Sequence, residues 1–188
     1  MALTTLTRAH RRDLAQLTGL AAGDLSVMWR KLDGADTTRD ALMDVLPRLI
    51  ATYGSAAATL GVDYYDEARY QAGARRRFRA IPAELPDEGR ADALARWGVS
   101  PLFKATPDPA AALTLVTGGL QRIIANADRE TVRFSSIQDP SAKGWVRVGS
   151  GSNCEWCAQY LDGEVHYVEG YDFDAHDWCN CGVDPVFD

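Results

Sequence analysis

The chain has 188 residues, 46% of them hydrophobic and 24% charged, so it can bury a core of its own. No apolar run approaches the roughly 20 residues that span a bilayer, which excludes a membrane-spanning helix. Residues 1–5 lack the basic start and apolar stretch of a signal peptide. We therefore expect a protein kept in a reducing compartment, where paired cysteines are metal ligands more often than disulfides.

The net charge of −6 is unevenly distributed along the chain. Residues 1–147 contain all 20 Lys and Arg residues together with 17 Asp and Glu, whereas residues 148–188 contain nine acidic residues and no basic ones. Nucleic-acid binding depends on neutralising phosphates. The acidic tail therefore disfavours a zinc knuckle that binds nucleic acid.

Four helices are expected in the first two thirds of the chain, because apolar residues recur there at steps of three and four. The first covers about Thr7–Leu32. The second runs from a threonine cap to about Ala72 (Thr37–Ala72), with a kink expected at Pro47 inside it. A short third helix lies around Arg90–Trp97, and a fourth begins at the capping residue Asp108. The expected buried face of the fourth helix consists of Leu113, Val116, Leu120, Ile124 and Ala127.

The pattern changes near Gly144. Alternating residues predict a strand over Trp145–Val148, and further short strands are expected over Glu164–Tyr167 and Val183–Phe187. One or two helical turns are expected over Cys154–Tyr160. We therefore predict an α+β fold, with a mostly helical domain over residues 1–140 and a small β-rich module over residues 141–188. The module has few large aliphatic residues, so a structural metal would contribute much to its folding.

Four arginines in five positions, Arg75, Arg76, Arg77 and Arg79, follow the second helix. They are typical of a solvated basic helix end, which the helix dipole favours. They are also typical of a surface that contacts DNA or an acidic partner. Both interpretations are open at the level of sequence.

All four cysteines fall within the last 35 residues, as Cys154-x-x-Cys157 and Cys179-x-Cys181, with His176 three residues before Cys179. Two such pairs can complete the tetrahedral coordination that structural zinc prefers. We expect one structural zinc ion per chain, bound by Cys154, Cys157 and Cys179. The fourth ligand is His176 or Cys181, and the tight Cys-x-Cys spacing favours His176.

The sequence leaves other roles open for these side chains. Two disulfides would need an oxidising compartment, and four buried thiols could act as small hydrophobic residues. A thioredoxin-like redox pair is disfavoured, because Cys154 and Cys157 do not lie in a βαβ pattern. His166 is expected to be a strand residue, and His10 lies in a basic segment that we expect to be exposed.

The tail resembles the Mu-F-like minor head proteins of tailed bacteriophages, above all versions from phages of actinobacteria that are often labelled capsid maturation proteases. The resemblance covers about residues 105–188, while the N-terminal helices match only in being helical and alanine-rich. The motifs that carry it are, in order, Asp139-Pro140, Gly144-Trp145-Val146-Arg147-Val148, Cys154-x-x-Cys157, His176-Asp177-x-Cys179-x-Cys181 and Pro185-Val186-Phe187.

This resemblance implies a structural minor capsid protein that acts in head morphogenesis and lies near the portal inside the phage head. It would be present in the host cytoplasm during assembly and then in the virion. The implied partners are the portal protein, the major capsid protein or both. Packaged DNA is a further expected partner, through the arginines Arg75, Arg76, Arg77 and Arg79. No membrane is expected to be involved.

A prohead protease is the alternative function. Its candidate parts are Ser150, Ser152, His166 and His176, but neither a Gly-x-Ser-x-Gly elbow nor a His-Glu-x-x-His motif is present. A histidine that binds zinc cannot also act as a general base, and a closed thiolate site is typical of structural zinc. We therefore expect no catalysis. A regulatory zinc module that binds protein partners is a third hypothesis.

Overall fold

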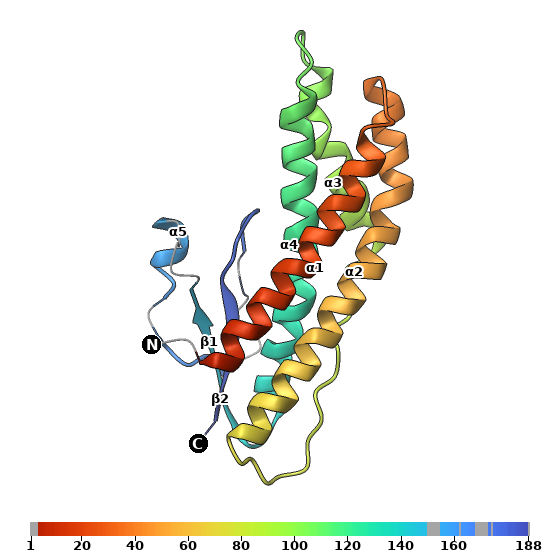
Figure 1. Ribbon diagram of the computed structural model, residues 1–188. Helices are drawn as coiled ribbons and strands as arrows, with labels where there is room; N and C mark the ends of the chain where they lie inside the picture. Colours follow the sequence, from red (N-terminus) through yellow and green to blue (C-terminus); the bar gives the residue numbers. More distant parts are fainter. Residues whose placement is uncertain (1–3, 150–154, 162, 168–172, 174, 188) are drawn as a thin grey trace.

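The computed structural model describes residues 4–149, 155–161, 163–167, 173 and 175–187. Long helices form a bundle, and a two-stranded sheet with the C-terminal segment packs against one end of it (Figure 1). The predicted fold class is confirmed: a mostly helical body precedes a small module that contains a strand pair and a Cys/His cluster. No helix in the described ranges is both long and apolar enough to cross a membrane.

The first two helices, α1 (Thr5–Trp29) and α2 (Ala35–Gln71), form an antiparallel hairpin (Figure 1). Thr4 caps α1 by accepting a hydrogen bond from the backbone N–H of Thr7. The predicted threonine cap of α2 is wrong, because α2 begins after Gly34, which has a φ of 80°. The predicted kink at Pro47 stays a prediction, since α2 continues through this residue.

The arginines at positions 75, 76, 77 and 79 do not belong to a helix end. The helix α2 stops at Gln71, and the four side chains are exposed in the irregular segment that follows. Arg69 holds the start of this segment, because its Nη2 donates to the carbonyl oxygen of Arg76. The basic cluster is therefore a solvated loop that lies against the end of α2.

The helix α4 (Pro109–Gln138) is central to the molecule. Asp108 caps it as predicted, by accepting a hydrogen bond of 2.9 Å from the N–H of Ala111. It packs against α1, α2, the helix α3 (Glu88–Gly98), the 3₁₀ helix η1 (Ser100–Phe103) and both strands. The sequence predicts a single buried face for α4, but the structure buries it on nearly all sides from Val116 onward. The helix η1 was not predicted, because its proline is typical of a loop.

The strands β1 (Ala142–Val148) and β2 (Gly182–Phe187) pair antiparallel, with Trp145 opposite Pro185. The predicted strand over 164–167 is reduced to one bridge, in which Trp145 and His166 exchange backbone hydrogen bonds of 2.9 and 2.8 Å. Gly144 makes this approach possible, because a Cβ atom there would collide with the carbonyl oxygen of His166. The short helix α5 (Glu155–Ala158) confirms the predicted helical turns.

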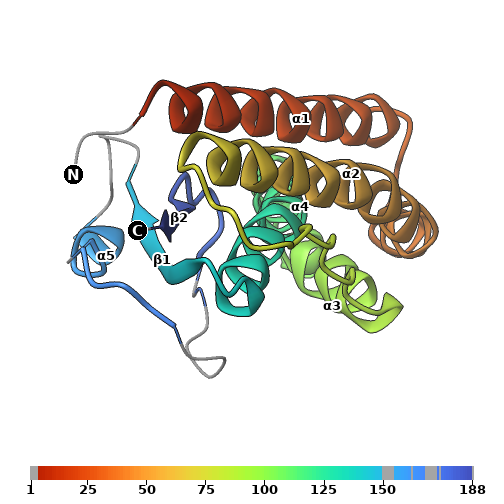
Figure 2. The ribbon, with the colours of Figure 1, turned by 90° about the horizontal axis from the view of Figure 1, so that it is seen from below.

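Within the described residues, two hydrophobic clusters stabilise the chain. The first lies between the helices. The second joins the body to the tail, since Tyr65 of α2 and Val132 of α4 pack with the fully buried Trp145 of β1 and with Cys157 and Cys181. Seen from the end of the bundle, the sheet lies beside the ends of α1 and α2, and α5 lies on the side of the sheet away from the helices (Figure 2). The cysteines are thus part of the core that fastens the tail to the helices.

Candidate metal centre

Three predicted ligands meet in the C-terminal module. Cys157 comes from α5, while His176 and Cys179 come from the segment that leads into β2. Their ligand atoms all lie within 4.8 Å of one another, so this cluster could hold a metal ion. Cys154, the other half of the Cys-x-x-Cys motif, lies outside the described residues.

The distances within the cluster fit a metal better than a disulfide. The sulfur atoms of Cys157 and Cys179 are 3.7 Å apart. A disulfide would bring them to about 2.05 Å. Two sulfurs bound tetrahedrally at about 2.3 Å from one zinc ion would be about 3.8 Å apart. The Nε2 atom of His176 lies 3.1 Å from the Cys157 sulfur, so a small outward shift of the imidazole would complete this side of a tetrahedron.

The imidazole of His176 is oriented by the turn that carries it. Its Nδ1 atom lies 2.6 Å from the carbonyl oxygen of Asp177, which can accept only from a protonated Nδ1. Nε2 is then the atom with the lone pair, and it faces Cys157. Histidines that bind metals commonly donate their second N–H in this way. The N–H of Cys179 donates to the carbonyl of His176 over 3.2 Å, so one tight turn positions both ligands.

The thiols of Cys179 and Cys181 share their protons unequally. The hydrogen bond from Cys181 lowers the pKa of Cys179 well below its ordinary value, against the opposing effect of burial, and the nearby Arg129 guanidinium acts in the same direction. The same hydrogen bond, with burial, raises the pKa of Cys181. Cys179 is therefore the thiolate of the pair, and the thiolate is the form that binds metals.

Arg129 of α4 fixes the backbone of this segment. It is fully buried, and its Nε and Nη2 atoms donate to the carbonyl oxygens of Cys181 and Cys179 at 3.0 and 2.7 Å. Its Nη1 donates to the side chain of Asn126 at 2.8 Å. All three acceptors are neutral, so among the described residues no carboxylate accepts a hydrogen bond from this buried guanidinium, although Asp128 lies nearby. A cluster of thiolates beside it would balance its charge.

Two further residues of α4 hold the turn from the same face of the helix as Arg129. The Nε of Arg122 lies 2.9 Å from a carboxylate oxygen of Asp177. Trp178 packs so closely on Gly118 that a Cβ atom there would lie 2.5 Å from the indole Nε1. Trp178 has a φ of 64°, which a tryptophan rarely adopts. The turn thus contacts α4 both through an ion pair and through close packing.

The other predicted site residues lie outside the three-residue cluster or outside the described residues. The thiol of Cys181 hydrogen-bonds to Cys179 and Cys157, beside the three-residue cluster. His166 lies apart from it, with its ring 4.6 Å from the ring of Trp145, as expected of a residue that pairs with a strand. Ser150 and Ser152 lie outside the described residues.

The structure contains a buried polar network that the sequence does not indicate, and His10 is part of it. This histidine is buried, with its Nε2 atom 3.0 Å from Asp128 and its ring stacked on Tyr64 at 4.1 Å. Tyr64 in turn donates to Asp184 of β2 at 2.7 Å. The expectation of an exposed His10 is wrong, because the packing of α1 on α4 and on the tail is a tertiary effect. The basic neighbours of His10 gave no signal of it.

The fold and the site together define a helical-bundle protein with a C-terminal Cys/His module that could hold a metal ion. The chain belongs to the VG15 protein family, whose model matches residues 1–188. No curated protein matches the chain, and no solved structure does.

Proposed function

We propose that this chain is a structural minor head protein of a tailed bacteriophage, placed near the portal inside the head, with one structural zinc ion in its C-terminal module. The observation that carries the proposal is that the motifs resembling Mu-F-like proteins meet in one packed unit. Trp145 is buried at its centre, and the strand that carries it pairs with the strand of the Pro-Val-Phe motif. Cys157 and Cys179 pack in the same core.

The zinc ligands in this proposal are Cys157, His176 and Cys179, with Cys154 as the fourth. Cys181 lies beside these ligands, where its thiol hydrogen-bonds to Cys179 and Cys157. A zinc ion with three thiolates and one imidazole carries a net charge of about −1. The buried guanidinium of Arg129 lies beside it and offsets that charge.

The proposed role of this zinc is structural rather than catalytic. Catalytic zinc keeps an open position for water or substrate, whereas structural zinc is enclosed by four protein ligands. Cys157 and Cys179 are buried, and α4 covers the segment through Arg122 and Arg129. This arrangement supports a rigid module fastened to a helical body, which suits a protein whose task is assembly.

The prohead protease hypothesis has less support from the described residues. A serine protease needs a base that contacts a nucleophile and is oriented by an acid. His176 lies in the cysteine cluster, and the polar partner of His10 is Asp128. The nearby hydroxyl of Thr7 is directed to Asp184 and Tyr64 instead of to His10.

Particles of the phage that encodes the chain provide the test. We expect mass spectrometry of purified virions to find the chain at low copy number, and Cys157→Ser to reduce its incorporation into heads. Ser150→Ala, Ser152→Ala and His166→Ala should leave incorporation and capsid-protein processing unchanged. Absence of the chain from purified heads would refute the proposal. A single Ser or His variant that folds and enters heads but blocks capsid-protein cleavage would establish the protease instead.

A further inference from the structure

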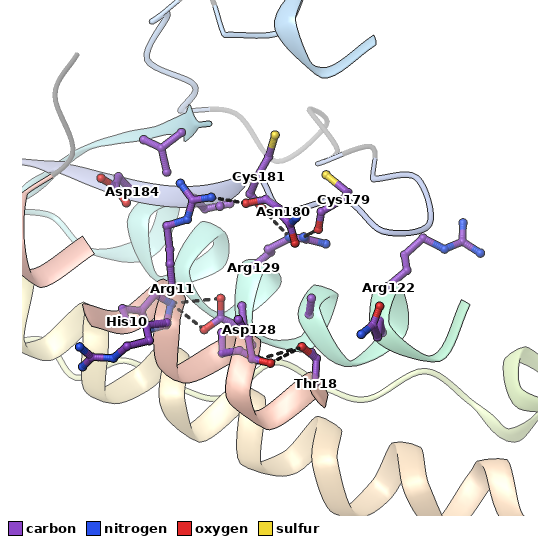
Figure 3. A pocket seen from close by; sticks show the side chains of 18 of the residues that line it. His10, Arg11, Thr18, Arg122, Asp128, Arg129, Cys179, Asn180, Cys181 and Asp184 are labelled. Atoms are coloured by element: carbon purple, nitrogen blue, oxygen red, sulfur yellow. Dashed lines mark hydrogen bonds and ion pairs between the residues drawn. The ribbon is translucent and has the colours of Figure 1, made fainter. Parts of the chain in front are cut away.

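A cavity of about 580 Å³ lies between α1, α4 and the segment 178–184, which leads from the metal cluster into β2 (Figure 3). Its volume falls within the range of about 300–1,000 Å³ that is typical of small-molecule sites. One wall includes Cys179 and Cys181, and the opposite wall is the first half of α1. The zinc proposal assigns no role to this space.

Five arginines line the cavity, in a protein whose net charge is −6. Three arginines come from α1 at steps of three and four residues, so they lie near one another along the helix, and two more come from α4. They are Arg8, Arg11, Arg12, Arg122 and Arg129. Several guanidinium groups around one space are the usual means of binding phosphate.

The two carboxylates that line the cavity are already engaged by other groups. Asp128 faces the imidazole of His10 at 3.0 Å. Asp184 accepts hydrogen bonds from the hydroxyl groups of Tyr64 and Thr7 at 2.7 and 3.0 Å. The neutral hydroxyl donors do not remove the charge of Asp184, which lies near Arg11. Arg122 is paired with Asp177, and Arg129 lies near the thiol of Cys179. The positive charge that a ligand could use therefore comes from Arg8, Arg11 and Arg12 of α1.

Arg11 is the arginine best placed to bind an anion. Figure 3 shows its side chain extending from α1 toward Asn180, and its two Nη atoms donate to the carbonyl oxygens of Asn180 and Gly149. These neutral acceptors fix the guanidinium, which has five N–H donors in all and donates two of them in these two bonds. Burial lowers the pKa of Arg11, against the opposing effect of the nearby Cys181 and Asp184. An anion in the cavity would relieve the cost of this burial.

The same cavity also offers an aromatic surface. Trp178 lines it and is half exposed, and Leu14 of α1 is another apolar residue of the lining. Flat aromatic side chains stack on nucleic-acid bases whatever the sequence. We propose that this cavity binds a nucleoside phosphate, with the phosphate against Arg8 and Arg11 and the base against Trp178.

The proposal is independent of the phage function and is tested on the purified, zinc-loaded full chain by calorimetry. The probes are adenosine monophosphate, adenosine, inorganic phosphate and a short single-stranded DNA. Adenosine monophosphate should bind saturably and at least about tenfold more tightly than adenosine or inorganic phosphate, because only it uses both surfaces. If the DNA binds more tightly than adenosine monophosphate and with a steep salt dependence, the natural ligand is a nucleic-acid strand. If it does not, the natural ligand is a free nucleotide.

Variants of α1 supply the controls. Arg11→Gln should weaken binding of adenosine monophosphate by at least about tenfold. Because Arg11 also holds the tail, Arg11→Gln could unfold the module as well as remove a ligand contact. Arg8 and Arg12 are exposed, so the double variant Arg8→Gln, Arg12→Gln should keep the fold. It should lose a similar factor in affinity for adenosine monophosphate. Arg30→Gln, at the other end of the same helix, should change nothing. Absence of saturable binding, affinity no greater than for inorganic phosphate, or equal binding by Arg8→Gln, Arg12→Gln would overturn the proposal.

Discussion

Arg129 of α4 is buried, and its Nη2 atom donates a 2.7 Å hydrogen bond to the carbonyl oxygen of Cys179. A charge in the helical body thus holds the backbone of a candidate metal ligand that lies 50 residues further along the chain. The contact couples the position of the thiolate to the position of α4. It also makes the state of the metal cluster relevant to the stability of the body.

We expect Arg129→Met to be severely destabilising. The variant leaves the carbonyl groups of Cys179 and Cys181 without their donor and removes the charge beside the thiolates. Loss of one partner from a buried charged network costs about 3–5 kcal/mol. Arg129→Lys keeps the charge but cannot reach both carbonyl groups. Its stability should therefore lie between that of Arg129→Met and that of the original chain. Urea unfolding monitored by tryptophan fluorescence would measure the difference. Equal stability of Arg129→Met and the original chain would contradict it.

Zinc removal should unfold the tail and leave most of the helical body. Metal binding is coupled to folding in small modules of this kind, whereas the helices have a hydrophobic cluster of their own. Protein purified without chelator should contain about one zinc per chain by elemental analysis. A chelator should then abolish the near-ultraviolet circular dichroism of the tail tryptophans but keep most of the helical signal. The same chelator saturated with zinc is the control, and zinc-free protein with an ordered tail would refute the prediction.

Serine variants of the cysteines can identify the fourth ligand. If Cys154 completes the site, Cys154→Ser and Cys157→Ser should each lose bound zinc, whereas Cys181→Ser should retain about one ion. Serine at position 181 can still donate a hydrogen bond to the Cys179 thiolate, in place of the bond that now lowers its pKa. Zinc content of the three purified variants decides the matter. Loss of zinc from Cys181→Ser with retention in Cys154→Ser would reverse the assignment.

Sequence patterns predicted the elements of this fold better than their contacts. The apolar repeats placed α1 to α4 within a few residues, and the Asp108 cap was found because capping is local. The cluster of Cys157, His176 and Cys179 was predictable because the spacing within each of its two motifs is typical of metal ligands, although the motifs lie about 20 residues apart. The roles of Arg129 and His10 were not, since each depends on partners more than 45 residues away. Their neighbours in sequence are charged, and this pattern indicates an exposed surface.

The basic cluster of residues 75–79 offers a test of the expected DNA contact. Replacing Arg75, Arg76, Arg77 and Arg79 together by Gln should weaken DNA binding and flatten its dependence on salt, by about 0.9 in logarithmic slope for each lost phosphate contact on duplex DNA. All four side chains are exposed, so the fold should survive. Arg30→Gln, Lys31→Gln at the end of α1 is the matched control. Unchanged affinity and slope would leave the cluster as a solvated surface.

The last prediction concerns the close packing of Trp178 on Gly118. A Cβ atom at position 118 would lie 2.5 Å from the indole Nε1 and 3.1 Å from the Cβ of Asp177, so the whole turn must move. We expect Gly118→Ala to cost about 1–3 kcal/mol of stability, as overpacking does, and to weaken zinc binding because Asp177 orients His176. Gly23→Ala in α1 is the control: nothing lies within 4 Å of its Cβ position, so alanine should stabilise that helix by up to about 1 kcal/mol. In a Trp178→Ala background, Gly118→Ala should lower the stability much less, because the clashing indole ring is absent. Thermal unfolding of the four combinations measures this coupling, and a cost that persists without the indole would show that the strain arises elsewhere in the turn.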